Sequence, residues 1–408
     1  MEPIAIVYFF YMFVSLYFLS LSLVIYFHNR NRIALDPIAN KPYFLSILIP
    51  AYNEEGTIAN TIHSVFETNY KFLKEVIVIN DGSKDKTLEI AKSLERKYPL
   101  LKVIDKKNSG KADSLNQAIR IVKGDFITII DADSYPDKDA FSKMMGYFDD
   151  KKVGVVTAAC TPINRETFLG RLQSIEYKVI AFTRKLLEFI DSIYVAPGSL
   201  SIYRKKALKD IGGFDPTNLT EDIESTWHLL KDGWKVRMSL SASVKTVVPT
   251  KLKDWWKQRV RWTVGGFQVI KKYIGYIFRN GMFGYFVIPF FLFGLVIGIM
   301  GLGIFIYLGI IKIIQNIGIM LYKLNSDLSP VTLSDLNLNP TLLNYFGITL
   351  FIFFLIFTLF VLLSMKDKSL KNENFLEILF YMTLYLIAYP PMIIWSVYKW
   401  IKGGVLWR

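Results

Sequence analysis

The fold of this chain is decided by DFITIIDAD, the stretch from residue 125 to residue 133. It begins with an almost unbroken apolar run, the pattern of a strand buried on both faces of a sheet, and it ends in two aspartates one residue apart. Other runs rich in Ile and Val occupy residues 46–50, 75–80 and 153–156. Segments with the apolar spacing of helices lie between them, one starting near Glu54 and others over residues 85–97 and 111–122. Strands that alternate with helices predict an α/β domain with a mostly parallel, doubly wound sheet.

Acidic segments follow three of these strands directly. The first strand runs into AYNEE (residues 51–55), the second into DGS (81–83) and the third into DAD (131–133). Open α/β sheets bind ligands at the carboxyl ends of their strands, so we expect the three segments at one rim of the sheet. Each segment alone is equally well explained as a turn or a helix cap. Their coincidence on three strand ends favours a ligand site.

A rim of carboxylates repels an anionic ligand unless a cation lies between them. Mg²⁺ and Mn²⁺ prefer oxygen ligands, and Mg²⁺ commonly combines one or two carboxylates with the phosphates of a substrate. Residues i and i+2 of an extended backbone point the same way, so we expect Asp131 and Asp133 to serve one metal and phosphate group. Lys111, at the start of a predicted helix, is either a further positive charge at this site or an ordinary solvated lysine. Zinc is disfavoured, because one Cys and three His offer no ligand cluster.

The composition indicates a polar domain combined with membrane segments. The 408 residues are 52% hydrophobic with a net charge of +14 and a mean hydropathy of +0.31, which excludes a disordered chain. The single Cys160 excludes a disulfide scaffold. Four apolar segments are long enough to cross a bilayer as helices, at about residues 3–27, 282–311, 342–363 and 375–400. The predicted organisation is an N-terminal membrane anchor and linker (1–40), an α/β domain (41–250), a basic interfacial segment (251–281) and a C-terminal membrane region of about three helices (282–408).

The order of charges around the first apolar segment predicts its orientation. The flank before it is MEP, and the positive charges that follow it are Arg30, Arg32 and Lys41. This is the order of an uncleaved signal anchor, and it places the α/β domain in the cytoplasm of a multi-pass plasma-membrane protein. Four spans then put the 365–374 loop, with Lys366, Lys368 and Lys371, inside, and the 311–341 loop and Arg408 outside. In the alternative topology, Pro390-Pro391 breaks the last segment into a re-entrant or interfacial piece and the tail stays inside.

The segment from Lys251 to Arg279 supplies half of the net charge. It carries eight basic residues and one acidic residue, with Trp255-Trp256 near its start. This composition is typical of an amphipathic helix on an anionic bilayer surface, with tryptophan at the depth of the headgroups. Because the charge lies next to a membrane segment, lipid is a simpler partner than nucleic acid.

Four short motifs occur along the chain in this order: Asp81-Gly82, Asp131-x-Asp133, Thr220-Glu221-Asp222 and Gln258-x-x-Arg261-Trp262. The third of them, taken alone, is also explained as a helix start capped by Thr220. Together with the membrane segments that follow, the set resembles the membrane-embedded, processive members of glycosyltransferase family 2, such as the cellulose, hyaluronan and poly-N-acetylglucosamine synthases. The similarity covers about residues 46–273. It implies a Rossmann-like GT-A fold, a nucleotide-diphosphate sugar donor (UDP-linked by preference), Mg²⁺ or Mn²⁺ as cofactor, and inversion at the anomeric carbon.

The resemblance also implies roles for individual residues. On the donor side, Tyr52, Glu54 and Asp81 would contact the nucleotide, and Lys111, Asp131 and Asp133 would hold the diphosphate and the metal. On the acceptor side, Asp222 beside Glu221 would be the general base, and Gln258, Arg261 and Trp262 would close over the diphosphate and the acceptor end. Gly198-Ser199 matches a small-residue motif near the acceptor, although Pro197 stands where cellulose synthases often have Cys.

The chemistry of these residue types agrees with the implied roles. An acceptor hydroxyl titrates far above neutral pH, so a carboxylate must take its proton as attack proceeds. The leaving diphosphate gains negative charge, which a metal and Arg261 stabilise. Trp262 offers an apolar face for a sugar ring. One base without a second, nucleophilic carboxylate gives a single displacement and therefore inversion.

Two alternatives to a polysaccharide synthase are open from the sequence. One is the transfer of a single sugar to a lipid, as ceramide glucosyltransferases do. The other is an inactive accessory subunit, which is disfavoured because Asp133, Asp222 and Arg261 are all present. The motifs do not specify the sugar, the linkage or the oligomeric state.

Overall fold

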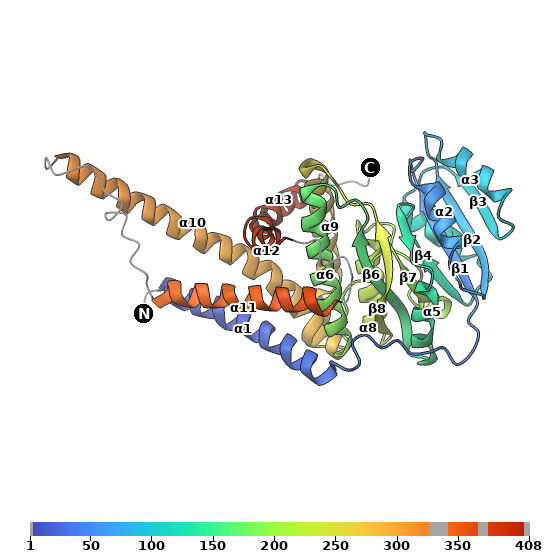
Figure 1. Ribbon diagram of the computed structural model, residues 1–408, viewed down its shortest axis with the longest axis horizontal. Helices are drawn as coiled ribbons and strands as arrows, with labels where there is room; N and C mark the ends of the chain where they lie inside the picture. Colours follow the sequence, from blue (N-terminus) through green and yellow to red (C-terminus); the bar gives the residue numbers. More distant parts are fainter. Residues whose placement is uncertain (1–2, 326–341, 366–373, 404–408) are drawn as a thin grey trace.

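The computed structural model describes residues 3–325, 342–365 and 374–403. An α/β domain forms one end of the molecule, and long helices extend from one side of it (Figure 1). The elements of the domain, in chain order, are β1 (Leu45–Ala51), α2 (Ile58–Phe66), β2 (Leu73–Asp81), α3 (Thr87–Glu95), β3 (Leu101–Lys106), α4 (Lys111–Ile119), β4 (Phe126–Ile129), β5 (Ser134–Pro136), α5 (Ala140–Met145), η1 (Gly146–Asp149), β6 (Val153–Pro162), α6 (Phe168–Glu188), β7 (Ser201–Arg204), α7 (Lys205–Asp210), α8 (Glu221–Lys231), β8 (Lys235–Thr246) and α9 (Leu252–Tyr273).

One eight-stranded sheet, in the order β3-β2-β1-β4-β7-β6-β8-β5, forms the centre of the domain. The strands β3, β2, β1 and β4 are parallel neighbours, β7 runs antiparallel between β4 and β6, and β6 and β8 are parallel. Every residue of β1 and β4 is buried, which explains their apolar runs. The α/β prediction and the strands expected near residues 46–50, 75–80, 125–130 and 153–156 are confirmed.

Two layers of helices cover the sheet. Helices α2, α3 and α5 pack on one face, and α4, α7 and α8 pack on the other. The apolar packing of the second layer continues past the end of the domain. Trp227 of α8 and Val269 of α9 belong to the same buried cluster as Phe283 and Val287. The domain is therefore joined to the first turns of a membrane helix through shared apolar packing.

The remaining elements form the apolar helices: α1 (Pro3–Asn29), η2 (Ile274–Tyr276), η3 (Phe283–Val287), α10 (Ile288–Asn325), α11 (Leu342–Ser364), α12 (Phe375–Phe380), the π-helical turn η6 (Tyr381–Tyr385) and α13 (Tyr389–Ile401). Within the described residues, four stretches are long and apolar enough to cross a membrane: Phe9–Asn29, Phe283–Tyr322, Gly347–Ser364 and Phe375–Ile401. The expectation that the second stretch ends near residue 311 is wrong, because the helix continues to Asn325. Its 40 residues measure about 60 Å at 1.5 Å per residue, about twice the thickness of a bilayer core.

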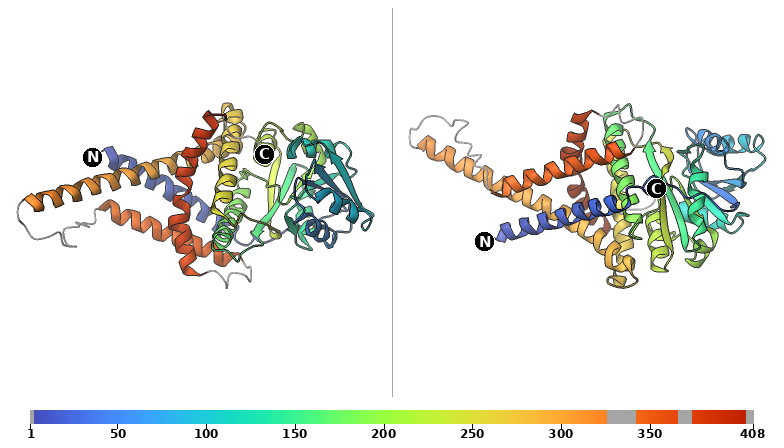
Figure 2. Two further views of the ribbon diagram at one scale, coloured as in Figure 1. Left: turned by 90° about the horizontal axis from the view of Figure 1, so that it is seen from above. Right: turned by 60° about the horizontal axis from the view of Figure 1, so that its bottom comes forward.

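The last apolar stretch differs from the others in its course. It contains the turn η6, and its helix restarts with Pro390-Pro391 in the first turn of α13. Helix α1 packs against α10 and α11. Helix α13 packs against both α9 and α10 and runs across the other apolar helices (Figure 2). The predicted charges Lys366, Lys368, Lys371 and Arg408 lie outside the described residues.

Candidate active site

Lys111 links two of the predicted motifs. Its ammonium Nζ lies 2.6 Å from Asp131 Oδ1 and 2.8 Å from Glu221 Oε1. Burial alone would lower the pKa of Lys111, but the two carboxylates outweigh it and the pKa is raised. The alternative of an ordinary solvated lysine is therefore wrong. The turn after β4 and the start of α8 meet at this one cation.

Gly198 allows the chain to pass close to this ion pair. Its carbonyl accepts a hydrogen bond from the backbone N–H of Asp131 (3.1 Å). A Cβ atom at residue 198 would lie 2.6 Å from Lys111 Nζ and 3.1 Å from Asp131 Oδ1. Only glycine fits without displacing the lysine, and the neighbouring Ser199 is buried. The structure thus places Gly198 beside Lys111 and Asp131, and the expected position of the Gly198-Ser199 pair near the acceptor stays a prediction.

Asp133 and Glu54 add two carboxylates that form no ion pair with a cation among the described residues. Burial, followed by the charges of Asp131 and Glu54, raises the pKa of Asp133. Burial also raises the pKa of Glu54, with smaller contributions from Asp131 and Asp85. The expectation that Asp131 and Asp133 lie on extended backbone is wrong, because the chain turns at residues 132–133 instead of continuing as a strand.

These carboxylates fit a hard divalent cation. They offer oxygen ligands only, and their mutual repulsion shows an excess of negative charge. Among the described residues there is no group of three or more His, Cys, Asp or Glu close enough to hold a metal. A cation bound by Asp131 and Asp133 would therefore need further ligands from a substrate, as is common for Mg²⁺.

Asp81 holds the loop that leads into α4. Its Oδ1 accepts hydrogen bonds from the backbone N–H of Ser109 (2.9 Å) and from Lys106 Nζ (2.6 Å), and its Oδ2 accepts from the N–H of Gly110 (2.9 Å). This loop carries Lys111 into place. The expected contact of Asp81 with a nucleotide stays a prediction, and so does that of Tyr52, whose side chain is exposed at the same rim.

Asp222 lies in the first turn of α8. Its Oδ1 accepts a hydrogen bond from the N–H of Ile223 (2.9 Å), and burial together with the neighbouring Glu221 charge raises its pKa to about 6. The capping interpretation of Thr220 is wrong: its side chain makes no cap bond within the described residues, and its hydroxyl donates to Asn218 Oδ1 (3.1 Å). A partly buried carboxylate with a raised pKa is a suitable general base.

Helix α9 carries Gln258, Arg261 and Trp262, and it is fixed to the start of α8. A Cβ atom at Gly265 would lie 2.3 Å from Thr220 Oγ1. The backbone N–H of Leu219 donates to Gln268 Oε1 (2.9 Å), and Tyr273 OH donates to Glu224 Oε1 (2.7 Å). The predicted base and the predicted acceptor-side residues are therefore parts of one packed unit.

One face of α9 is exposed and basic, as the sequence predicted, with Lys253 and Lys257 on the surface and the exposed Lys251 directly before the helix. The other face is packed against protein: Trp255, Arg259 and Val264 are buried. An amphipathic helix lying only on lipid is thus an incomplete description. Gln258 Oε1 is buried and finds no hydrogen-bond donor among the described residues, which leaves an acceptor available to a ligand.

Sequence reasoning missed a buried ion pair beside these residues. Arg259 Nη2 lies 2.6 Å from Glu176 Oε2, and both side chains are almost fully buried. The Arg259 guanidinium lies 4.2 Å from the centroid of the Trp262 ring. Arg259 stands inside the Gln258-x-x-Arg261-Trp262 motif, but Glu176 belongs to α6, a helix whose apolar spacing gave no signal.

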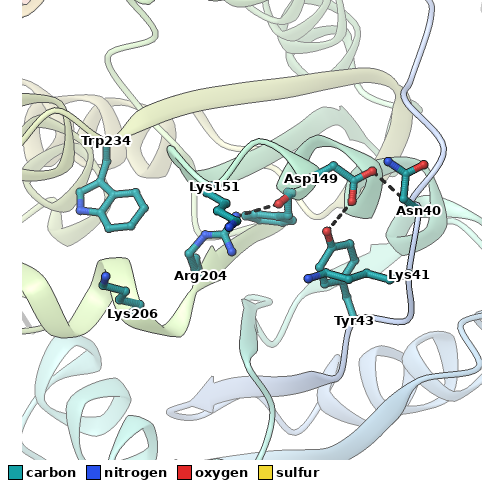
Figure 3. Close-up of a pocket in the computed structure, with 9 residues that line it drawn as sticks. Asn40, Lys41, Tyr43, Asp149, Lys151, Arg204, Lys206 and Trp234 are labelled. Atoms are coloured by element: carbon teal, nitrogen blue, oxygen red, sulfur yellow. Dashed lines mark hydrogen bonds between the residues drawn. The ribbon is translucent and has the colours of Figure 1, made fainter.

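The domain also has a pocket of about 410 Å³ that is separate from this site (Figure 3). Arg204, which pairs with Phe126 at the start of β4, lines it together with Lys41, Lys151, Lys206 and Trp234. It therefore lies at the opposite end of β4 from Asp131. No predicted site residue lines this pocket.

Comparison with known proteins shows which family this chain is similar to. Residues 46–212 match the family model described as glycosyl transferase family 2. Over 268 residues the chain is 33% identical to poly-β-1,6-N-acetyl-D-glucosamine synthase of Staphylococcus aureus (strain MSSA476), covering 64% of this chain and 65% of that protein. The same enzyme of Staphylococcus epidermidis is 32% identical with the same coverage. The match thus spans slightly less than two thirds of these relatives.

A solved structure shows the same fold. The mannosyltransferase PcManGT of Pyrobaculum calidifontis, in complex with GDP-Man and Mn²⁺, superimposes with a TM-score of 0.59 at 15% identity. The superposition covers 98% of this chain and 99% of that one. At this identity the likeness concerns the fold, which is GT-A.

Proposed function

We propose that this chain is a glycosyltransferase of family 2 and that it transfers a sugar, with inversion, from a nucleotide-diphosphate donor to a growing polysaccharide at a membrane. The observation that carries this proposal is Lys111, which contacts both Asp131 and Glu221. It unites the residues expected at the donor diphosphate with the turn that holds the base. A polymer is favoured over a single lipid acceptor, because the relatives at 32–33% identity are named as synthases of a poly-N-acetylglucosamine.

Asp222 is the proposed general base. It accepts the proton of the acceptor hydroxyl as that oxygen attacks the anomeric carbon, and the bond to the diphosphate breaks. Its raised pKa makes it a stronger base than an exposed aspartate. One base and one displacement invert the anomeric centre.

Cationic side chains stabilise the leaving diphosphate in this proposal. Lys111 and Arg261 supply positive charge. Asp131 and Asp133 would hold Mg²⁺ or Mn²⁺, which when bound neutralises phosphate charge. Trp262 offers its ring to the acceptor sugar, and the unpaired Gln258 Oε1 accepts from a ligand hydroxyl. Tyr52, Glu54 and Asp81 form the proposed nucleotide end of the site.

The membrane arrangement belongs to the same proposal. Helices α1, α10 and α11 cross the bilayer, and the catalytic domain lies at the cytoplasmic face of the plasma membrane. The crosswise course of α12–α13 beside α9 supports the interfacial alternative for the last apolar segment, with the tail inside. A cysteine at Lys402, labelled with an impermeant reagent in intact cells, tests this: labelling would show that the tail is outside.

The function is tested with the full chain in detergent or nanodiscs. UDP-N-acetylglucosamine is the first donor to try, against other labelled UDP- and GDP-sugars, with Mn²⁺ or Mg²⁺. Sizing of the product separates a polymer from a single addition to lipid. The matched control is Asp222→Asn, which keeps shape but cannot accept the proton. Failure of all donors with the parent chain would refute the proposal.

A further inference from the structure

Four elements that are distant in sequence meet at the Glu176 carboxylate. Glu176 of α6 accepts hydrogen bonds from Arg259 Nη2 of α9 (2.6 Å), from Tyr385 OH of η6 (2.8 Å) and from Tyr389 OH of α13. The indole Nε1 of Trp255, also on α9, donates to Tyr385 OH (2.8 Å). One buried charge thus receives three donors, two of them from the last apolar segment.

The local chain geometry makes this meeting possible. Tyr385 ends the π-helical turn η6, and Tyr389 begins α13 one turn later. Residues four apart lie on the same face, so both hydroxyls reach one carboxylate. A π-helical turn is rare and is often retained at functional sites. A helix that only had to be apolar needs neither this turn nor two inward tyrosine hydroxyls.

The same ion pair reaches the acceptor side of the site. The Arg259 guanidinium lies 4.2 Å from the Trp262 ring centroid, and Arg259 stands between Gln258 and Arg261 on the same helix. Because Glu176 fixes the far end of this guanidinium, it also limits where the Trp262 ring can lie. At its other end, α9 is held independently by Lys272 and Tyr273, each 2.7 Å from Glu224 Oε1.

We propose that Glu176 is a positioning residue: through the Tyr385 and Tyr389 hydroxyls, the last apolar segment sets the placement of Arg259 and hence of Gln258, Arg261 and Trp262 over the catalytic carboxylates. This inference rests on the proposed function. The claim that the last apolar segment holds α9 in place can be tested without measuring activity. Glu176 itself touches none of the residues assigned to the donor in the described contacts.

The cleanest perturbation is Tyr389→Phe, alone and together with Tyr385→Phe. Each change removes a hydroxyl and keeps the ring, and the segment stays tied to α6 by the ion pair between Arg171 and Glu377 (2.6 Å). Glu176→Gln is the harsher variant, since it leaves Arg259 buried without its counter-charge. The matched control is Tyr398→Phe, on the same helix with an exposed side chain.

Hydrogen exchange of the full chain in detergent gives a readout that needs no activity. We expect the double tyrosine variant to exchange faster at residues 254–264, while residues 268–273, held by Glu224 and Leu219, keep the parent rate. Unchanged exchange over residues 254–264 would overturn the proposal even if the chain proved to have another activity. Uniformly faster exchange along the whole chain would also overturn it, since that indicates general destabilisation.

Kinetics give the second readout. A misplacement of the order of 1 Å costs up to about 100-fold in rate, so we expect kcat to fall by about tenfold with donor KM unchanged. In combination with Trp262→Ala, the tyrosine variants should cause a smaller further loss than in the parent, because part of their effect acts through this ring. A full further loss in that background, or a rise in donor KM with kcat unchanged, would overturn the positioning role.

Discussion

Gly265→Ala is the sharpest test of how α9 sits against the base. An added Cβ would lie 2.3 Å from Thr220 Oγ1, 2.5 Å from its Cγ2 and 2.9 Å from its Cβ. All three contacts are with one β-branched side chain, so no single rotation of Thr220 clears them. Ordinary contact begins at 3.4 Å, and α9 must therefore move by about 1 Å relative to the turn that holds Asp222.

The expected effect follows from this shift. Overpacking costs about 1–3 kcal/mol, against which the better helix propensity of alanine returns up to about 1 kcal/mol. Stability should therefore fall only modestly. The displaced Arg261 and Trp262 should lower kcat by about 100-fold, since a 1 Å misplacement has effects of that size.

The assay combines thermal unfolding with transfer kinetics, in the parent and in two further variants. Gly294→Ala is the control: it makes the same change in a helix, at a position with no atom within 4 Å. Thr220→Ala removes two of the three clashing atoms, so the Gly265→Ala/Thr220→Ala pair should regain most of the lost rate relative to Thr220→Ala alone. If Gly265→Ala kept kcat within about twofold of the parent, the rigid coupling of α9 to the base would be refuted.

Four further results are expected. Asp222→Asn should retain donor binding, measured by equilibrium dialysis, and lose transfer by several orders of magnitude; transfer near the parent rate would remove it as the base. Asp133→Asn should weaken Mn²⁺ and donor binding together, and an unchanged metal titration would point to a purely structural turn. Because Asp222 must be ionised and its pKa is raised to about 6, transfer should be level above pH 7 and fall roughly tenfold per pH unit below about 6, with donor binding measured at each pH; a level profile down to pH 5 would contradict this. Gly198→Ala should displace the Lys111 ammonium and raise the donor KM, while thermal unfolding should show only a small loss of stability.

The elements that could be predicted are those whose buried residues are apolar. Strands β1, β2 and β4 are buried on both faces, so their runs were visible in the sequence. Strand β8 mixes buried and half-buried residues over KVRMSLSASVKT, and β5 has only three residues, so neither has a clear pattern. Helix α6 was missed for a different reason: its buried residues include Gln173, Glu176 and Arg184. Apolar periodicity is weak in a helix whose buried residues mix polar and apolar side chains, as these do with Leu172, Ile175 and Phe182.

The site was predictable in its residue types but not in its pairings. Carboxylates at three strand ends indicated a ligand rim, and the rim is where Asp131 and Lys111 meet. The contact of Lys111 with Glu221 joins residues that no local spacing relates. The same holds for Glu176 and Arg259, which are 83 residues apart. Such pairings are set by the packing of α4, α6, α8 and α9, which only the folded chain defines.

The buried cluster that runs from Trp227 and Val269 into Phe283 and Val287 has a mechanical consequence. A domain attached to its membrane helices by a flexible linker could swing toward a lengthening product. Within the part of the chain that the structure describes, this domain has no such hinge, because the apolar packing of α8 and α9 continues into Phe283 and Val287. Under the proposed function, the carboxylates of the site therefore stay at one depth relative to the bilayer. Each added sugar would then be accommodated by movement of the acceptor, so that the product advances while the site stays in place.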